Sequence, residues 1–339
     1  MEKVTMKEIT REEIPAITDL LIERQKIERE SFPDLLNPNP NRAKTRKTLE
    51  KLFDSGKVIG AAGLQNGELL GFLLGRVMVD TRNGRYVSVP YEGMAIREDQ
   101  SFELLRELYT HASPLWLEQG CFNHSVLVPL GNPVYYEGFQ QLSFAIEQVH
   151  ALMRIQDYKP FQNLPDLNVR IAEKKDSEAL ACMSGIITQC QNAAPSFVPA
   201  YPEVVEMIRE GFRGLAEEEN DIVLIAEKYG EVLGFHDYEI IDSDLMIPDG
   251  GIGLDVAGTC QSWRGKGVGK NLVNEGCRVL KEKGFSTIKT DWRITNLSSS
   301  RFWPKCGFKP VAYRMARSLD EHIAWAIYKG TEGDLNPSS

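Results

Sequence analysis

Two spacings of apolar residues alternate along the chain and predict an α/β protein. Short runs with apolar residues at every second position predict strands, and longer segments with apolar residues three or four apart predict amphipathic helices. In the first half of the sequence these patterns predict strands over residues 4–9, 57–64, 69–79, 87–96 and 125–129, and helices over residues 12–27 and 102–119, with a further helix ending at Phe53.

The same order of elements restarts after residue 168. Strands are expected over residues 169–172, 222–228 and 232–241, and helices over residues 177–191 and 203–216. Short sequence matches support a duplication, because they recur at nearly constant offsets of 163, 165 and 169 positions. These matches pair Gly67–Phe72 with Gly230–Phe235, Ser31-Phe32 with Ser196-Phe197, and Gly138-Phe139 with Gly307-Phe308.

The duplication predicts two domains of similar size. We expect the first in residues 1–156, a linker containing two prolines in residues 157–168, the second domain in residues 169–330, and a flexible tail in residues 331–339. A length of 339 residues agrees with two domains.

Composition narrows the class of protein. A net charge of −9 argues against a nucleic-acid partner. The chain has neither an amino-terminal apolar segment nor a run of about 18 apolar residues, so we expect a cytoplasmic protein with no membrane partner. The six cysteines form no C-x-x-C pair and have no histidine at ligand spacing, so no metal is expected.

The stretch Trp263–Lys270 carries the clearest chemical signal. Its glycines, Gly265, Gly267 and Gly269, have no Cβ and adopt positive φ readily, so consecutive amides can turn toward an oxyanion. A strand is expected before this loop and a helix from Val268 after it, which would add the positive end of a helix dipole. The spacing matches neither the dinucleotide-binding G-x-G-x-x-G pattern nor a Walker loop.

Two motifs in this half resemble those of one enzyme family. Arg264-x-x-Gly267-x-Gly269 resembles the pyrophosphate loop of the GNAT acyl-CoA-dependent N-acyltransferases, and Asn296–Phe308 resembles a later helix and turn of the same family. The resemblance implies an α/β fold of two tandem GNAT-like domains, each with a mixed, mostly antiparallel central sheet flanked by helices.

The resemblance also implies an acetyl-CoA site in the second domain. Backbone groups of Thr259 and Cys260 would contact the pantetheine arm and polarise the thioester carbonyl. Asn296 would hydrogen-bond the same arm or cap its own helix. The residues expected at the CoA site are Thr259, Cys260, Arg264, Gly265, Lys266, Gly267, Val268, Gly269, Lys270, Asn296, Ser299 and Phe302.

The expected catalytic residues are less clearly marked, because Trp303 stands where the family usually has a tyrosine acid. The thiolate would leave unassisted, or Tyr313 or a water molecule would protonate it. Asp255 is the candidate base, on the same face of its strand as Thr259 if no bulge intervenes. His236, Tyr238 and Glu239 are the alternatives.

The first domain lacks the glycine loop. Its counterpart, residues 95–101, has no glycine and contains two carboxylates, and the shorter distance from Asn132 to Gly138 predicts a shortened helix. We therefore expect one degenerate and one working half. The expected activity is transfer of an acetyl group to a small-molecule amine by a monomer or homodimer, with a non-catalytic acyl-CoA-binding or regulatory protein as the alternative.

Overall fold

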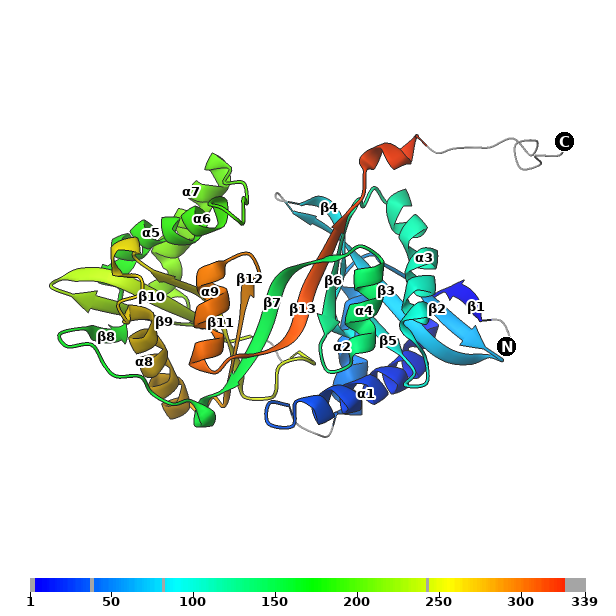
Figure 1. The fold of residues 1–339 in the computed structure, drawn as a ribbon, viewed down its shortest axis with the longest axis horizontal. Helices are drawn as coiled ribbons and strands as arrows, with labels where there is room; N and C mark the ends of the chain where they lie inside the picture. Colours follow the sequence, from blue (N-terminus) through cyan, green and yellow to red (C-terminus); the bar gives the residue numbers. More distant parts are fainter. Residues whose placement is uncertain (1–3, 37–39, 81–82, 242–243, 327–339) are drawn as a thin grey trace.

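The computed structural model describes residues 4–36, 40–80, 83–241 and 244–326. The predicted tail, residues 331–339, lies outside this range. A single mixed sheet runs through both halves of the molecule in the order β1-β2-β3-β4-β6-β13-β7-β12-β11-β10-β9-β8, with β5 paired to β3 alone (Figure 1). No helix among the described residues is long and apolar enough to cross a membrane.

The first half follows the predicted order closely. The predicted strand over residues 87–96 is interrupted by a turn of 3-10 helix at Tyr91–Gly93, which separates β4 from β5. The elements are β1 Thr5–Glu8, α1 Ile14–Ser31, α2 Arg42–Asp54, β2 Val58–Gln65, β3 Glu68–Asp80, β4 Gly84–Val89, β5 Met94–Ile96, α3 Phe102–Glu118, β6 Asn123–Pro129, α4 Pro133–Gln141 and β7 Ala145–Arg154.

The second half repeats this order, with the helix predicted over residues 177–191 divided in two at Ser184. Its elements are β8 Asn168–Ile171, α5 Ser177–Met183, α6 Gly185–Asn192, α7 Pro202–Gly214, β9 Asp221–Lys228, β10 Glu231–Glu239, β11 Gly251–Thr259, α8 Val268–Glu282, β12 Thr287–Arg293, α9 Leu297–Phe302 and β13 Lys309–Ser318.

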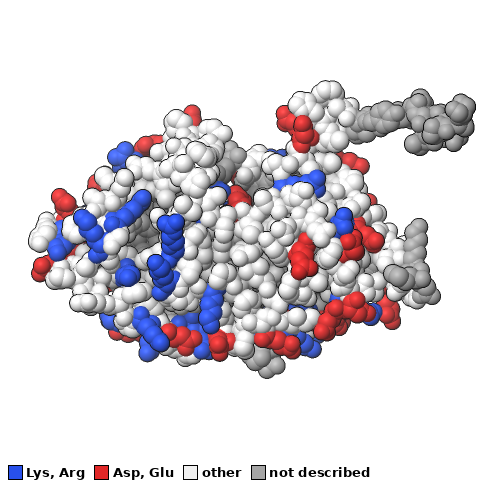
Figure 2. Space-filling view, in the orientation of Figure 1, with Lys and Arg blue, Asp and Glu red and all other residues white. Residues whose placement is uncertain are grey.

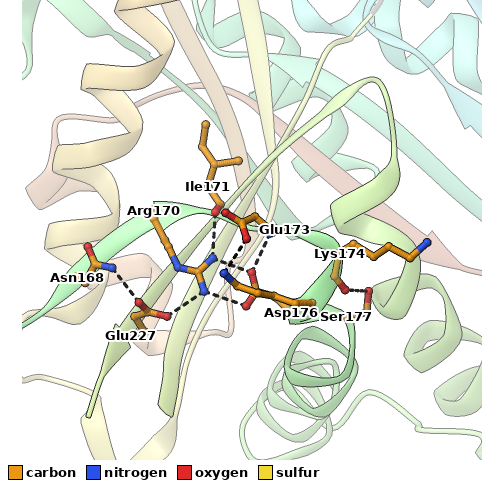
Figure 3. Close-up of polar contacts among 9 residues, drawn as sticks. Asn168, Arg170, Ile171, Glu173, Lys174, Asp176, Ser177 and Glu227 are labelled. Carbon is orange, nitrogen blue, oxygen red and sulfur yellow. Dashed lines mark hydrogen bonds and ion pairs between the residues drawn. The ribbon is translucent and has the colours of Figure 1, made fainter. Parts of the chain in front are cut away.

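The duplication extends to single side chains near the start of each half. Arg170 on β8 pairs with Asp176 at 2.7 Å and with Glu227 on β9 at 2.9 Å, and Asp176 accepts from the Glu173 amide in a capping box (Figure 3). In the first half, Lys7 and Glu13 pair in the same way, 163 positions earlier. Each pair ties the first strand of its half to the start of the following helix.

One predicted repeat is wrong. Gly138 lies inside α4, a helix of nine residues, whereas Gly307 has a φ of 98° in the turn before β13. The structural counterpart of Gly307 is Ser143, which also has positive φ, so the offset here is 164 and not 169. The first-half helix is therefore not shortened, since α4 is longer than α9, its six-residue counterpart.

The halves exchange their last strands. β7 of the first half pairs with β12 of the second, and β13 of the second half pairs with β6 of the first (Figure 1). The division of the sequence near residue 156 stays a prediction, but in space each half takes one strand from the other.

The sheet has two helix-covered faces. Apolar clusters place α1, α2 and α5–α7 on one face, which we call the α5 face, and α3, α4, α8 and α9 on the other, the α8 face. The linker crosses the outside of α8, where Asn271 accepts from the Leu164 amide at 3.0 Å and Asn274 accepts from the Phe161 amide at 2.9 Å. These bonds fix the linker beside the start of α8.

Candidate acyl-CoA site

The second half contains a V-shaped opening between two parallel strands. β11 pairs with β12 only from Gly251 to Leu254, and the rest of β11 pairs with β10 alone. A register shift between Asp237 and Tyr238 of β10 leaves Asp255 as an extra, bulged residue of β11. Because a bulge bends its strand, β11 leaves β12 at this point, and Leu254 marks the apex of the opening.

Backbone groups of β11 line the opening. The Cys260 amide donates to the Leu233 carbonyl of β10 at 2.9 Å. Since successive residues of an antiparallel strand point their amides to opposite sides, those of Ala257 and Thr259 face away from β10, toward the opening. The prediction of Cys260 as an amide donor is therefore wrong, because the sheet already uses its N–H, and Ala257 is a donor that was not predicted from the sequence.

The Cys260 side chain also points elsewhere. Its thiol lies 3.6 Å from the Met183 sulfur, and burial raises the pKa of this thiol. The Thr259 carbonyl accepts from the Arg264 guanidinium at 3.2 Å, which holds the start of the glycine loop against the end of β11.

The glycine loop has the geometry expected of an anion-binding loop. Gly265 and Gly267 have φ values of 76° and 98°, in the left-handed region that favours glycine. α8 begins at Val268 with no side-chain cap and no acidic residue in its first turn. The amides of its first turn, which include those of Val268, Gly269 and Lys270, therefore remain available to a ligand.

Gly269 serves close packing as well. A Cβ added there would lie 3.1 Å from the Phe302 ring and 3.7 Å from the Thr259 hydroxyl. A Cβ on Gly267 would lie 3.3 Å from Leu164 of the linker. The absence of side chains at these positions lets α8 approach both the end of β11 and α9.

Cations surround the loop. Arg264, Lys266 and Lys270 are exposed, with the Lys266 amine 5.1 Å from the Trp263 ring centroid and the Lys270 amine 4.5 Å from that of Phe161. Figure 2 shows Lys and Arg side chains gathered around a hollow on this half of the molecule, in the region of β10, α8 and α9. Such a field favours an anionic ligand.

α9 follows β12 and packs beside the start of α8, where Phe302 lies next to Gly269. The Asn296 side chain caps α9 by accepting from the Ser299 amide at 3.2 Å, so the capping alternative is confirmed for this residue. Trp303 is buried between Phe302 and Phe308, at centroid distances of 4.8 and 5.3 Å. No hydroxyl stands at this position, so Trp303 supplies packing and no acid.

Two alternative bases belong to the core. His236 is buried, and burial lowers its pKa to about 3. Its Nδ1 lies 3.1 Å from the Tyr238 hydroxyl, which is itself buried, and burial raises the pKa of that hydroxyl. Neither group exchanges protons easily near neutral pH.

The same-face prediction for Asp255 is wrong, because the bulge intervenes. The Thr259 side chain lies close to Gly269 on the α8 face. The α8 face of the sheet holds the side chains of Ile288 and Trp292 of β12 and of Leu254 of β11. Because side chains alternate between the two faces along a strand, Asp291 of β12 lies on the α5 face. Burial raises the pKa of Asp255, and the negative charge of nearby Asp291 raises it further.

Tyr313 lies on β13, with its ring 6.0 Å from that of Tyr136. β7 separates β13 from β12, so two strand spacings, about 10 Å, lie between Tyr313 and the nearer edge of the opening. This position gives little support to Tyr313 as the acid.

Asp237 on β10 was not predicted as a site residue from the sequence. It is only 3% exposed, opposite Val256 and beside the bulge, and its Oδ1 has no hydrogen-bond partner. Burial, together with the charges of Asp221, Asp255 and Glu239, raises its pKa to about 7. The signal in the sequence was a carboxylate within the apolar run from Val232 to Tyr238.

The equivalent position in the first half is closed by its own side chains. The Ile96 amide, counterpart of Thr259, donates to the Tyr135 hydroxyl at 3.0 Å. Buried Arg24 donates to the carbonyls of Tyr91 and Met94, each at 2.6 Å. Ser101 caps α3 by accepting from the Glu103 amide, so this helix end already has a partner.

A cleft of about 590 Å³ lies elsewhere, lined by residues that include Leu35, Arg154, Pro248 and Phe285. None of its lining residues belongs to the glycine loop or to α9. The glycine loop and the free amides that could bind a diphosphate and a thioester lie at the opening between β11 and β12. We therefore place the candidate site there.

Known proteins resemble both the sequence and the fold. Residues 189–308 match the profile of the Acetyltransferase (GNAT) family. A GCN5-related N-acetyltransferase from Sphaerobacter thermophilus superposes with a TM-score of 0.59 at 12% identity, over 93% of this chain and 95% of that one. No curated protein sequence matches this chain.

Two further structures share the fold. A tandem GNAT protein from the clavulanic acid biosynthesis pathway superposes with a TM-score of 0.52 at 11% identity, over 93% of this chain and 98% of that one. A GCN5-related glucosamine N-acetyltransferase region of a fungal β-N-acetylglucosaminidase superposes with a TM-score of 0.55 at 14% identity, over 93% of this chain and 38% of that one. The chain therefore has the fold of tandem GNAT proteins, and residues 189–308 of its second half match the Acetyltransferase (GNAT) family.

Proposed function

We propose that the second half transfers an acetyl group from acetyl-CoA to the amine of a small molecule. One observation carries this proposal. The wide end of the opening between β11 and β12, at Thr259, lies beside the glycine loop and the uncapped amino terminus of α8. A pyrophosphate at the loop would leave the pantetheine arm free to run along β11 toward the apex at Leu254.

The backbone would orient the thioester. The Thr259 and Ala257 amides face the opening, and an amide aimed at the thioester carbonyl stabilises the negative charge that develops on its oxygen. Side chains on Arg264 and Lys266 would strengthen binding of the diphosphate. Positioning the amine beside the thioester supplies the larger part of the rate enhancement in such a site.

The reaction needs one proton acceptor. The ammonium must lose one proton before its nitrogen forms a bond to the carbonyl carbon. The carbon–sulfur bond then breaks, and the nitrogen releases a second proton to solvent as the amide forms. The thiolate can leave without a general acid, because the thiol pKa is low enough to make it a tolerable leaving group. It then takes a proton from solvent. Asp255, exposed at the bulge, and Asp237, with a pKa of about 7, are the carboxylates that could accept the amine proton.

A non-catalytic acyl-CoA-binding protein is the alternative, favoured by Trp303 at the position of the family's acid. Release of free thiol from acetyl-CoA discriminates between the two functions. Acetyl transfer predicts thiol release that depends on an added amine, with an acetylated amine as product. Tight CoA binding without amine-dependent release would favour the alternative.

The assay has a matched pair of variants. Asp255→Asn should lower kcat/KM at neutral pH by up to about a hundred-fold if Asp255 is the base, with partial recovery at higher pH, where more of the amine is already deprotonated. Glu118→Gln, an exposed site at the end of α3, should leave the rate unchanged. Full activity of Asp255→Asn at neutral pH would remove Asp255 from the mechanism.

A further inference from the structure

Four carboxylates lie together on the α5 face beside the apex of the opening. Glu239 of β10 pairs in register with Asp221 of β9, and Asp237 lies two residues before Glu239, so the three side chains share one face. Asp255 protrudes at the bulge next to the Val256 partner of Asp237. We call Asp221, Asp237, Glu239 and Asp255 the acidic cluster.

Asp237 is the buried member of this cluster. Its Oδ1 is fully shielded from solvent and has no hydrogen-bond partner among the described residues. A buried carboxylate without a partner is unfavourable, and three neighbouring carboxylates make its ionisation more so. A bound cation would supply the missing partner.

The nearest cation on the neighbouring strand is already paired. Lys289 of β12, which favours the ionised form of Asp255, lies 3.0 Å from Asp291. On the opposite flank, Glu218 adds a further negative charge near Asp221. The cluster therefore keeps an excess of negative charge on both sides.

The spacing of the cluster favours an elongated organic cation over a metal ion. Nowhere in the described part of the chain do three or more His, Cys, Asp or Glu side chains converge as metal ligands. The carboxylates are instead spread over β9, β10 and β11. Asp237 and Glu239 are two strand residues apart, which corresponds to about 7 Å.

We propose that the acceptor is an amine with two or more positive charges, such as an α,ω-diamine or a longer polyamine. Its reacting nitrogen lies beside the exposed Asp255 at the apex of the opening, close to the buried Asp237, and its second ammonium lies between Asp221 and Glu239. This inference rests on the acetyl transfer proposed above. It disfavours acceptors with a carboxylate at the second position, because the cluster repels them.

The test compares acceptors of equal length. Thiol release is measured with α,ω-diamines of three to six carbons, with the corresponding alkyl monoamines, and with ω-amino acids of the same lengths. The cluster predicts a kcat/KM for the best diamine about five- to thirty-fold above that of its monoamine, with the amino acid lowest. Glu239→Gln and Asp221→Asn should bring the ratio of diamine to monoamine close to one, whereas Glu118→Gln should preserve it.

The outcomes separate the two proposals. Equal rates for diamines and monoamines, or an unchanged ratio in Glu239→Gln and Asp221→Asn, would overturn the diamine acceptor and leave acetyl transfer intact. Absence of turnover with every amine would overturn the proposed function. In that case calorimetric titration of the CoA-bound protein with the diamines decides the inference: binding that Glu239→Gln weakens supports the site, and no binding overturns it.

Discussion

Asp237 combines burial with three neighbouring carboxylates, so its ionised form is unfavourable in the folded protein. Burial and repulsion both raise its pKa, from 3.8 to about 7. A group with this pKa exchanges protons near neutral pH, which suits a base for an ammonium substrate. The same property makes the residue costly for stability, as is common at functional sites.

We predict that Asp237→Asn stabilises the protein at pH 8 and not at pH 4. The folded-state pKa is raised, so the charged form destabilises the native state progressively between about pH 4 and 7, and fully above pH 7. Removing the charge should gain on the order of 2–4 kcal/mol at pH 8. Urea unfolding of the variant, the parent and Glu118→Gln at both pH values measures this difference.

An equal effect at pH 4 and pH 8 would contradict the assignment, because below the unfolded-state pKa the carboxyl is neutral in both states. A loss of stability at pH 8 would show that Asp237 has a partner in solution.

The glycine loop was predictable from the sequence, because its conformation depends on the residues of the loop itself. Gly265 and Gly267 need positive φ, and three glycines within five residues leave few other interpretations. The direction of Asp255 was not predictable, because a bulge depends on pairing with β10 and leaves no mark on the spacing within β11. The same register decides that the Cys260 amide is used by the sheet.

At the scale of elements, β7 and β13 are the least predictable part of the fold. In a simple duplication each of these strands would close its own half, and apolar patterns alone do not distinguish that arrangement from the observed one. The patterns specify a strand and its buried face, but they do not specify which neighbouring strand pairs with it. Exchange between the halves is a tertiary property, and it joins two predicted domains into one sheet.

The exchange predicts that neither half folds stably alone. Residues 1–156 would lack β13, which lies between β6 and β7, and residues 157–326 would lack β7, which lies between β13 and β12. Each isolated half would expose unpaired strand edges and aggregate or associate. Size-exclusion chromatography and urea unfolding of the halves, produced separately and together, measure this.

Co-production should yield a one-to-one complex that unfolds cooperatively. A well-folded monomer of either half on its own would contradict the exchanged arrangement of β7 and β13.

At the scale of the whole molecule, two copies of one fold have become chemically unequal. The second half keeps an opening, a glycine loop and an uncapped helix end. In the first half, Tyr135, Arg24 and Ser101 occupy the corresponding backbone groups. The missing glycines in the sequence predicted this asymmetry, but two of the three closing side chains, Arg24 of α1 and Tyr135 of α4, are remote in sequence from the loop.

The stoichiometry of CoA binding tests this account most directly. Calorimetric titration of the intact protein should give one CoA per chain. Gly267→Asp should weaken binding about thirty- to a thousand-fold by placing a charge and a side chain among the loop amides. Gly265→Asp should act in the same direction: its added Cβ meets no atom within 4 Å, and the φ of 76° makes a side chain unfavourable there as at Gly267.

Gln100→Asp, in the corresponding loop of the first half, is the matched control and should leave affinity unchanged. Thermal unfolding of all variants verifies that they are folded. One site that only the second-half substitutions weaken is the predicted result. Two equivalent sites, or CoA binding that survives Gly267→Asp and Gly265→Asp at full affinity, would contradict the assignment of the acyl-CoA site to the β11–α8 loop.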